Sequence, residues 1–128
     1  MLFETLTIAG DQTLQELIRD AKTRFFNLND KQIALEKLWD AFERLKTYYV
    51  DLDKKNSLIK IISICGFDED ILIKEFEMLT KIGNSFQIRH HETNRIPIEN
   101  IQDLDYLFYR MLSLINFCII KINTYEIN

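Results

Sequence analysis

The residues that could do chemistry are concentrated in one short stretch of the chain. Both histidines of the protein, His90 and His91, lie beside Arg89, and Arg95 follows in the same segment. An imidazole can move a proton near neutral pH because its reference pKa is about 6.5. A guanidinium can hold a phosphate through two parallel hydrogen bonds. The stretch therefore predicts a site for phosphate or RNA.

The chemistry of such a site would be RNA cleavage without a metal. His90 or His91 would take the proton of a 2′-hydroxyl or protonate the leaving oxygen, and Arg89 would stabilise the charge that develops on the phosphate. Phe86 and Ile88 alternate with polar residues, which predicts a small β-hairpin before the last helix. Residues two apart on a strand share a face, so the hairpin would aim Arg89 and His91 in one direction.

Two other interpretations of the same cluster stay open. Arg89 could pair with Glu92 or Glu99 while the histidines bond to backbone at a turn, and the cluster would then be structural. Zinc could use His90, His91 and Glu92, but neighbouring strand residues face opposite ways and no cysteine pair is near. We therefore expect no metal and no other cofactor.

Further residues are expected to border this site. Trp39, Glu43 and Lys46 share one shoulder of a predicted helix, because they are spaced by four and three residues. Trp39 could equally anchor the core, since it borders an apolar stripe. Gly83 and Asn84 could form a backbone nest for an anion or simply cap a helix. The candidate binding residues are therefore Asn84, Glu92, Arg95, Trp39, Glu43 and Lys46.

The elements that must position these residues are helices. Apolar side chains recur at helical spacing in segments that begin near Thr13, Asp30, Asp68 and Asn100. Residues 57–65 fit either a helix or a strand, and Gly66 directly after them favours a helix that ends in a glycine cap. The pattern predicts a mainly α fold, a bundle of four to five helices.

Three local predictions refine this architecture. The first 11 residues should form an extended arm, linker or short strand, because Leu6 and Ile8 alternate with threonines. The helix that starts near residue 68 should stop at Gly83 and the asparagine after it. On the second helix, Asp40 and Arg44 should form a solvent-exposed ion pair across one helical turn.

Composition limits the class of protein. A chain of 128 residues fits one domain, with residues 12–124 as the helical bundle. The formal net charge of −4 provides no general attraction to nucleic acid, so any such contact needs a local basic patch. Cys65 and Cys118 lie far apart in apolar sequence and offer no disulfide framework, which predicts a reducing, cytoplasmic location.

The last helix suggests a second subunit but not a membrane. Its apolar run, residues 111–122, is shorter than the roughly 20 residues that cross a bilayer. The helix is nonetheless apolar nearly all round, so it should lie at the centre of a bundle or be covered by a partner. Exposing such a surface costs about 25 cal/mol per Å². A homodimer is therefore expected.

Three segments form a distinctive combination: residues 34–47 (ALEKLWDAFERLKT), 79–92 (LTKIGNSFQIRHHE) and 105–110 (DYLFYR). Together they resemble the C-terminal domain of bacterial abortive-infection-like proteins, which is related to the HEPN (higher eukaryotes and prokaryotes nucleotide-binding) helical superfamily. The similarity covers most of residues 12–122. It implies a helical bundle, often homodimeric, in a group that includes metal-independent ribonucleases of phage defence.

The resemblance also implies roles for particular residues. HEPN nucleases have an arginine and a histidine separated by four to six intervening residues, and the two are paired across a dimer cleft. Arg89 matches that arginine, but positions 94–96 hold Asn, Arg and Ile. His90 or His91 would therefore have to supply the imidazole. The alternative is a non-catalytic dimerisation or regulatory module of a larger defence protein, which would contact a regulatory protein partner.

Overall fold

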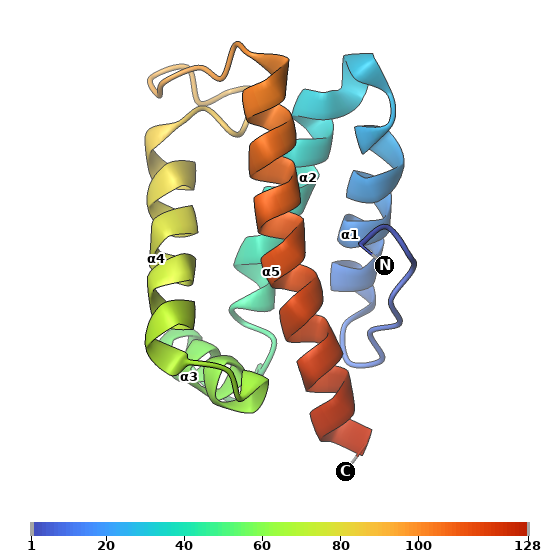
Figure 1. The fold of residues 1–128 in the computed structure, drawn as a ribbon, viewed down its shortest axis with the longest axis vertical. Coiled ribbons are helices and arrows are strands. Elements are labelled where there is room, and N and C mark those ends of the chain that lie inside the picture. Colours follow the sequence, from blue (N-terminus) through green and yellow to red (C-terminus); the bar gives the residue numbers. More distant parts are fainter. Residues whose placement is uncertain (1, 128) are drawn as a thin grey trace.

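The computed structural model describes residues 2–127, and these form five α-helices and one short 3-10 helix (Figure 1). The predicted mainly helical fold is confirmed. None of the described helices combines the length and apolarity that crossing a membrane requires. In chain order the elements are α1 (Gln12–Phe25), η1 (Leu28–Asp30), α2 (Lys31–Leu45), α3 (Lys54–Cys65), α4 (Glu69–Ser85) and α5 (Ile101–Ile127).

Aspartates begin three of the helices. The Asp11, Asp53 and Asp68 side chains each accept a hydrogen bond from a backbone N–H in the first turn of α1, α3 and α4. The cap of α1 is thus Asp11, two residues earlier than the predicted Thr13. Residues 57–65 belong to a helix, as favoured, and Gly66 ends it in the left-handed conformation with φ +67°.

Helix α5 lies at the centre of the bundle (Figure 1). It packs against α2 and α3, and α1 covers the other side of α2. Its side chains Met111, Leu112, Ile115 and Ile119 are fully or almost fully buried. Helix α5 therefore buries one side within the chain, while Tyr106, Tyr109 and Ile120 stay exposed on another.

The N-terminal arm folds back onto α1 and α5 instead of extending away. Phe3 stacks against Phe25 and Phe108, with ring centroids 5.8 and 6.3 Å apart. Ile8 is only 2% exposed. The Nδ2 of Asn116 donates to the carbonyl oxygen of residue 2 at 2.8 Å. Within residues 2–11 the predicted short strand is absent. Side chains of α1 and α5 instead donate hydrogen bonds to backbone carbonyl oxygens of the arm. Residue 1 lies outside the described residues.

Helix α4 docks on α2 through a glycine. A Cβ atom on Gly83 would lie 2.0 Å from the Trp39 ring, so only a glycine lets the indole approach this closely. Between the same two helices, Phe76 of α4 stacks on Phe42 of α2 with ring centroids 5.6 Å apart. The predicted stop at Gly83 and Asn84 lies in the last turn of α4, which ends at Ser85. The glycine is required by packing rather than by the helix end.

The predicted β-hairpin is not found, because the structure contains no strand within residues 2–127. Phe86 and Ile96 instead form an isolated parallel bridge. Ile88 is completely buried, and the Nε2 of Gln32 donates to its carbonyl oxygen at 2.7 Å. The segment is thus held by the helical bundle, which satisfies backbone groups that a partner strand would otherwise have to satisfy.

We expect Gly83→Ala to lower the free energy of unfolding by about 1 to 3 kcal/mol, because the new methyl group must displace the Trp39 ring. This loss should exceed the roughly 1 kcal/mol that alanine gains in helix propensity. Urea denaturation measures it. The neighbouring exposed position provides the control, and Asn84→Ala should stay within about 0.5 kcal/mol of the wild type. An unchanged or more stable Gly83→Ala protein would contradict the packing argument.

Candidate functional site

The predicted site lies on the segment that joins α4 to α5 at one end of the bundle (Figure 1). This segment, residues 86–100, contains Arg89, His90, His91, Glu92 and Arg95. Short turns dominate it, with backbone hydrogen bonds from residue 92 to 89 and from 95 to 92. The structure therefore does bring these five residues together at one surface loop.

Arg89 is held by a carboxylate from another helix. Its guanidinium pairs with Asp40 of α2, and both side chains are about one third exposed. The backbone N–H of Arg89 donates to Glu92 at 3.1 Å. The predicted ion pair between Asp40 and Arg44 is not formed, because Arg44 contacts Asp11 at 2.8 Å instead. The charge expected to clamp a phosphate is thus compensated by Asp40.

Arg95 is also paired. Its Nη1 donates to the carbonyl oxygen of Gly83 at 2.7 Å and lies 2.9 Å from the carboxylate of Glu92. A cation near the last carbonyl groups of a helix is favourable because of the helix dipole. Arg95 and Glu92 therefore fasten the connecting segment to the end of α4.

The two imidazoles face solvent. His90 and His91 are both exposed, and neither ring makes a hydrogen bond or ion pair within residues 2–127. Only their backbone carbonyls are engaged, one by the Gln87 side chain at 2.7 Å and the other by the Thr93 N–H at 2.9 Å. The loop thus presents two unpaired imidazoles beside two paired guanidiniums.

Trp39, Glu43 and Lys46 form a contact between α2 and α4. Lys46 is buried, with its Nζ 2.6 Å from the Glu43 carboxylate and 2.7 Å from the Thr80 hydroxyl. The same Nζ lies 4.3 Å from the centre of the Phe42 ring. Burial lowers the pKa of Lys46. Burial acts to raise the pKa of Glu43, but the hydrogen bonds and charges of Lys46 and Lys54 together lower it. This set fixes helix packing.

Asn84, the remaining candidate, is exposed and belongs to the last turn of α4 rather than to a loop. It stands at the edge of an open groove of about 640 Å³ between α3 and α4. Ile59 and Ile73, both about half exposed, contribute to the lining of that groove.

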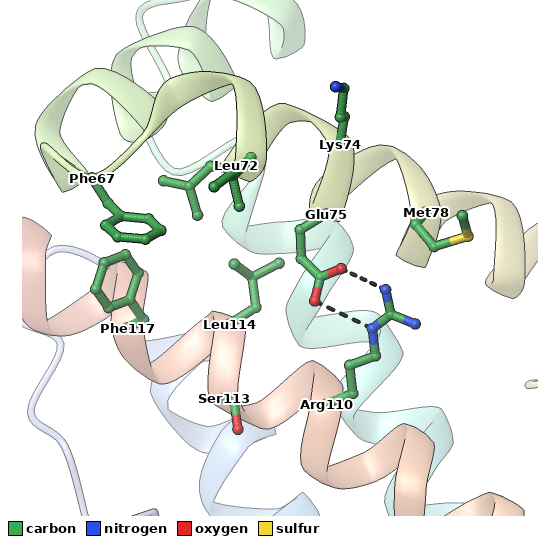
Figure 2. A pocket seen from close by; sticks show the side chains of 10 residues that line it. Phe67, Leu72, Lys74, Glu75, Met78, Arg110, Ser113, Leu114 and Phe117 are labelled. Atoms are coloured by element: carbon green, nitrogen blue, oxygen red, sulfur yellow. Dashed lines mark hydrogen bonds and ion pairs between the residues drawn. The ribbon is translucent and has the colours of Figure 1, made fainter.

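A larger groove of about 720 Å³ runs between α4 and α5. Figure 2 shows the Phe67 and Phe117 rings facing each other at one end. Most of the lining is apolar, and Phe67, Ile71 and Met78 remain 58%, 54% and 44% exposed. The residues that line the groove are Phe67, Ile71, Leu72, Lys74, Glu75, Met78, Arg110, Ser113, Leu114 and Phe117.

One ion pair crosses this α4–α5 groove. The guanidinium of Arg110 on α5 binds the Glu75 carboxylate on α4 through two contacts, at 3.2 and 2.5 Å (Figure 2). A bidentate pair of this kind fixes both the distance and the orientation of the two groups. The pair therefore holds the groove at a defined width while leaving its apolar end open.

Sequence reasoning missed the grooves, although a signal for them was present. The buried stripe of α4 consists of Leu72, Phe76 and Leu79. Ile71 and Met78 fall outside that stripe and are exposed. A helix with apolar residues beyond its buried stripe has surface to offer to a partner.

Comparison with known proteins provides no relative: no family model, curated protein or solved structure matches this sequence. Among residues 2–127 no group of three or more histidine, cysteine, aspartate or glutamate side chains is arranged to hold a metal ion. The site must therefore be interpreted from its own contacts.

If Lys46 belongs to the packing of α2 against α4, Lys46→Ala should lower the free energy of unfolding by about 1 to 3 kcal/mol. The change removes the hydrogen bond to Thr80 and leaves half-buried Glu43 with only its weaker contact to Lys54. The exposed Lys81 provides a matched control, and Lys81→Ala should cost less than about 0.5 kcal/mol. Chemical denaturation distinguishes the two, and equal effects would refute the assignment.

Proposed function

We propose that this chain is a HEPN-like, non-catalytic helical module of a bacterial antiviral defence protein, and that it works by associating with a second copy of itself. The observation that carries the proposal is the α4–α5 groove with its exposed apolar lining. The resemblance of residues 34–47, 79–92 and 105–110 to abortive-infection-like proteins supports the defence context.

Exposure of this kind favours a protein partner. Phe67, Ile71 and Met78 are large apolar side chains that line the same groove and stay about half in contact with water. Exposed apolar side chains that are gathered in one groove can form an interaction site. Covering it would gain about 25 cal/mol for each Å² removed from water.

The distribution of charge along α4 favours a second copy as the partner. The helix begins with Asp68, Glu69 and Asp70, all exposed, and ends near the exposed Lys81. A two-fold pairing with antiparallel α4 helices would set the acidic start of each copy opposite the basic end of the other. Between these ends the helix carries Lys74, Glu75 and Glu77, and Glu75 is paired with Arg110 of α5.

The electrostatics of the connecting segment support a non-catalytic role. Arg89 pairs with Asp40, and Arg95 pairs with Glu92. A guanidinium that already holds a carboxylate must release it before it can bind a phosphate. The chain also has a net charge of −4, which repels RNA at long range.

Self-association can be tested by introducing a charged side chain into the α4–α5 groove. We expect Ile71→Lys to weaken the dimer at least about tenfold, since a lysine cannot be buried there without a partner. Sedimentation equilibrium measures the dissociation constant. Ile120→Lys on α5 is the matched control, because Ile120 is 51% exposed against 54% for Ile71 but does not line the groove. A wild-type protein that stays monomeric at high concentration would overturn the proposal.

A second candidate function is metal-independent binding or cleavage of RNA, with Arg89 as phosphate clamp and His90 or His91 as acid and base. The observation in its favour is that both imidazoles are exposed and unpaired within the described residues, on the same turn as Arg89. Histidines in this state are free to exchange protons with a substrate.

This second function can be tested by removing the carboxylate that pairs with Arg89. If Arg89 binds phosphate, Asp40→Asn should strengthen binding of single-stranded RNA severalfold, because the guanidinium loses its carboxylate partner. His91→Ala and Arg89→Ala should abolish any cleavage seen in EDTA. Arg44→Ala, which removes an exposed arginine elsewhere, serves as the control. Absence of both binding and cleavage in the wild type and in Asp40→Asn would exclude this candidate.

A further inference from the structure

The two cysteines of the chain, separated by 53 positions, meet inside the bundle. Cys65 is the last residue of α3, and Cys118 lies in the second half of α5. Their Sγ atoms are 3.8 Å apart, and both residues are buried. Two thiols at this distance share a weak S–H···S hydrogen bond. Nothing in the sequence pattern alone indicated this contact.

We propose that Cys65 and Cys118 are a reversible oxidation site, in which a peroxide converts the buried thiol pair into a disulfide that ties α3 to α5. This inference stands apart from the proposed self-association. It requires only the two thiols and the freedom of one helix end.

The distance between the sulfurs is short enough for bond formation. A disulfide has an S–S length of about 2.05 Å, so the sulfurs must approach each other by less than about 2 Å. Cys65 can supply that movement, because α3 ends at this residue and Gly66 follows in the left-handed conformation. Helix ends open more readily than helix centres, which also provides a small oxidant with access to the sulfur.

The environment assigns different roles to the two thiols. The Cys65 thiol donates to the Cys118 sulfur in the structure, and once Cys65 is ionised the Cys118 thiol can donate in return. That hydrogen bond stabilises the Cys65 thiolate and lowers the pKa of Cys65. The same hydrogen bond, together with burial, raises the pKa of Cys118. The thiolate is the nucleophilic form of cysteine. Cys65 is therefore the thiol that reacts first, and Cys118 resolves the product.

The chemistry balances with hydrogen peroxide as the oxidant. The Cys65 thiolate attacks one peroxide oxygen, the O–O bond breaks, and the departing hydroxide takes a proton to become water. The Cys118 sulfur then attacks the sulfenic acid on Cys65, an S–S bond forms and the S–O bond breaks. The second hydroxide leaves with the Cys118 proton as water. Two thiols are oxidised, and one peroxide is reduced to two waters.

The position of the pair gives the bond a structural consequence. The disulfide would enclose α4 and the connecting segment in one covalent loop between residues 65 and 118. Phe67 follows Cys65 by two residues, Phe117 precedes Cys118, and these two rings meet edge to face at 6.3 Å at the end of the α4–α5 groove (Figure 2). Oxidation would therefore fasten that end of the groove.

The experiment treats the full chain, freed of reductant, with excess hydrogen peroxide. We expect a monomer lighter by two hydrogen atoms, a proteolytic peptide that links Cys65 to Cys118, and full reversal by dithiothreitol. The melting temperature should rise by about 5 to 15 °C, because the bond constrains the unfolded chain. Amide exchange in residues 64–70 should slow.

Cys118→Ala is the matched variant for this experiment, and three outcomes would refute the proposal. Cys118→Ala cannot form the bond and should show neither the lighter mass nor the rise in melting temperature. If that variant does not fold, the linked wild-type peptide still decides the question. Oxygen addition without a crosslink, thiols that stay unmodified, or disulfides only between separate chains would each overturn the proposal.

Discussion

The burial of α5 is the constraint on which the rest of this structure depends. A helix that is apolar nearly all round must be covered on several sides, and no single neighbour can do this. Helices α2 and α3 cover two sides, and the N-terminal arm covers another through Phe3. Helix α4 approaches through a bidentate ion pair and leaves a groove beside α5. The groove is open because α4, unlike α2 and α3, leaves part of the facing side of α5 uncovered.

The position of α4 follows from its contacts with α2 rather than with α5. Gly83 admits the Trp39 ring, and Lys46 on α2 bonds to Thr80 on α4. These contacts join α4 to α2, while the Glu75–Arg110 ion pair crosses the groove between α4 and α5. The apolar residues that face this space, including Phe67 and Met78, are left half exposed. The groove therefore lies beside a core that stays buried.

Charge on the connecting segment is organised by the same tertiary contacts. In the sequence, Arg89 and Arg95 form a cationic cluster in an acidic chain. In the folded protein, a carboxylate from α2 reaches the first arginine, and the second is shared between Glu92 and the end of α4. The pairs anchor the loop, since each joins the segment to a helix or to itself. The histidines are left exposed because no element of the bundle approaches their rings.

The sequence by itself determined that the fold is helical and where most of the helices lie. The periodicity of apolar residues, the aspartate at position 68 and the glycine at position 66 act within a few residues of themselves, so local interactions were enough to place these features. The start of α3 after Asp53 was not predicted. The sequence also determined that α5 had to be covered. The gathering of Arg89 and the two histidines on one loop followed directly from their adjacency in the chain.

Only the tertiary structure decided which groups meet across the bundle. Asp40 could bond to Arg44 by local spacing, yet the fold brings Arg89 to Asp40 and leaves Arg44 to Asp11. No strand forms where the hairpin was predicted, and Ile88 is instead completely buried in the core. The contact between the two cysteines and the α4–α5 groove depend on how helices distant in sequence pack. No local pattern records that geometry, because each partner's spacing is consistent with many arrangements of the bundle.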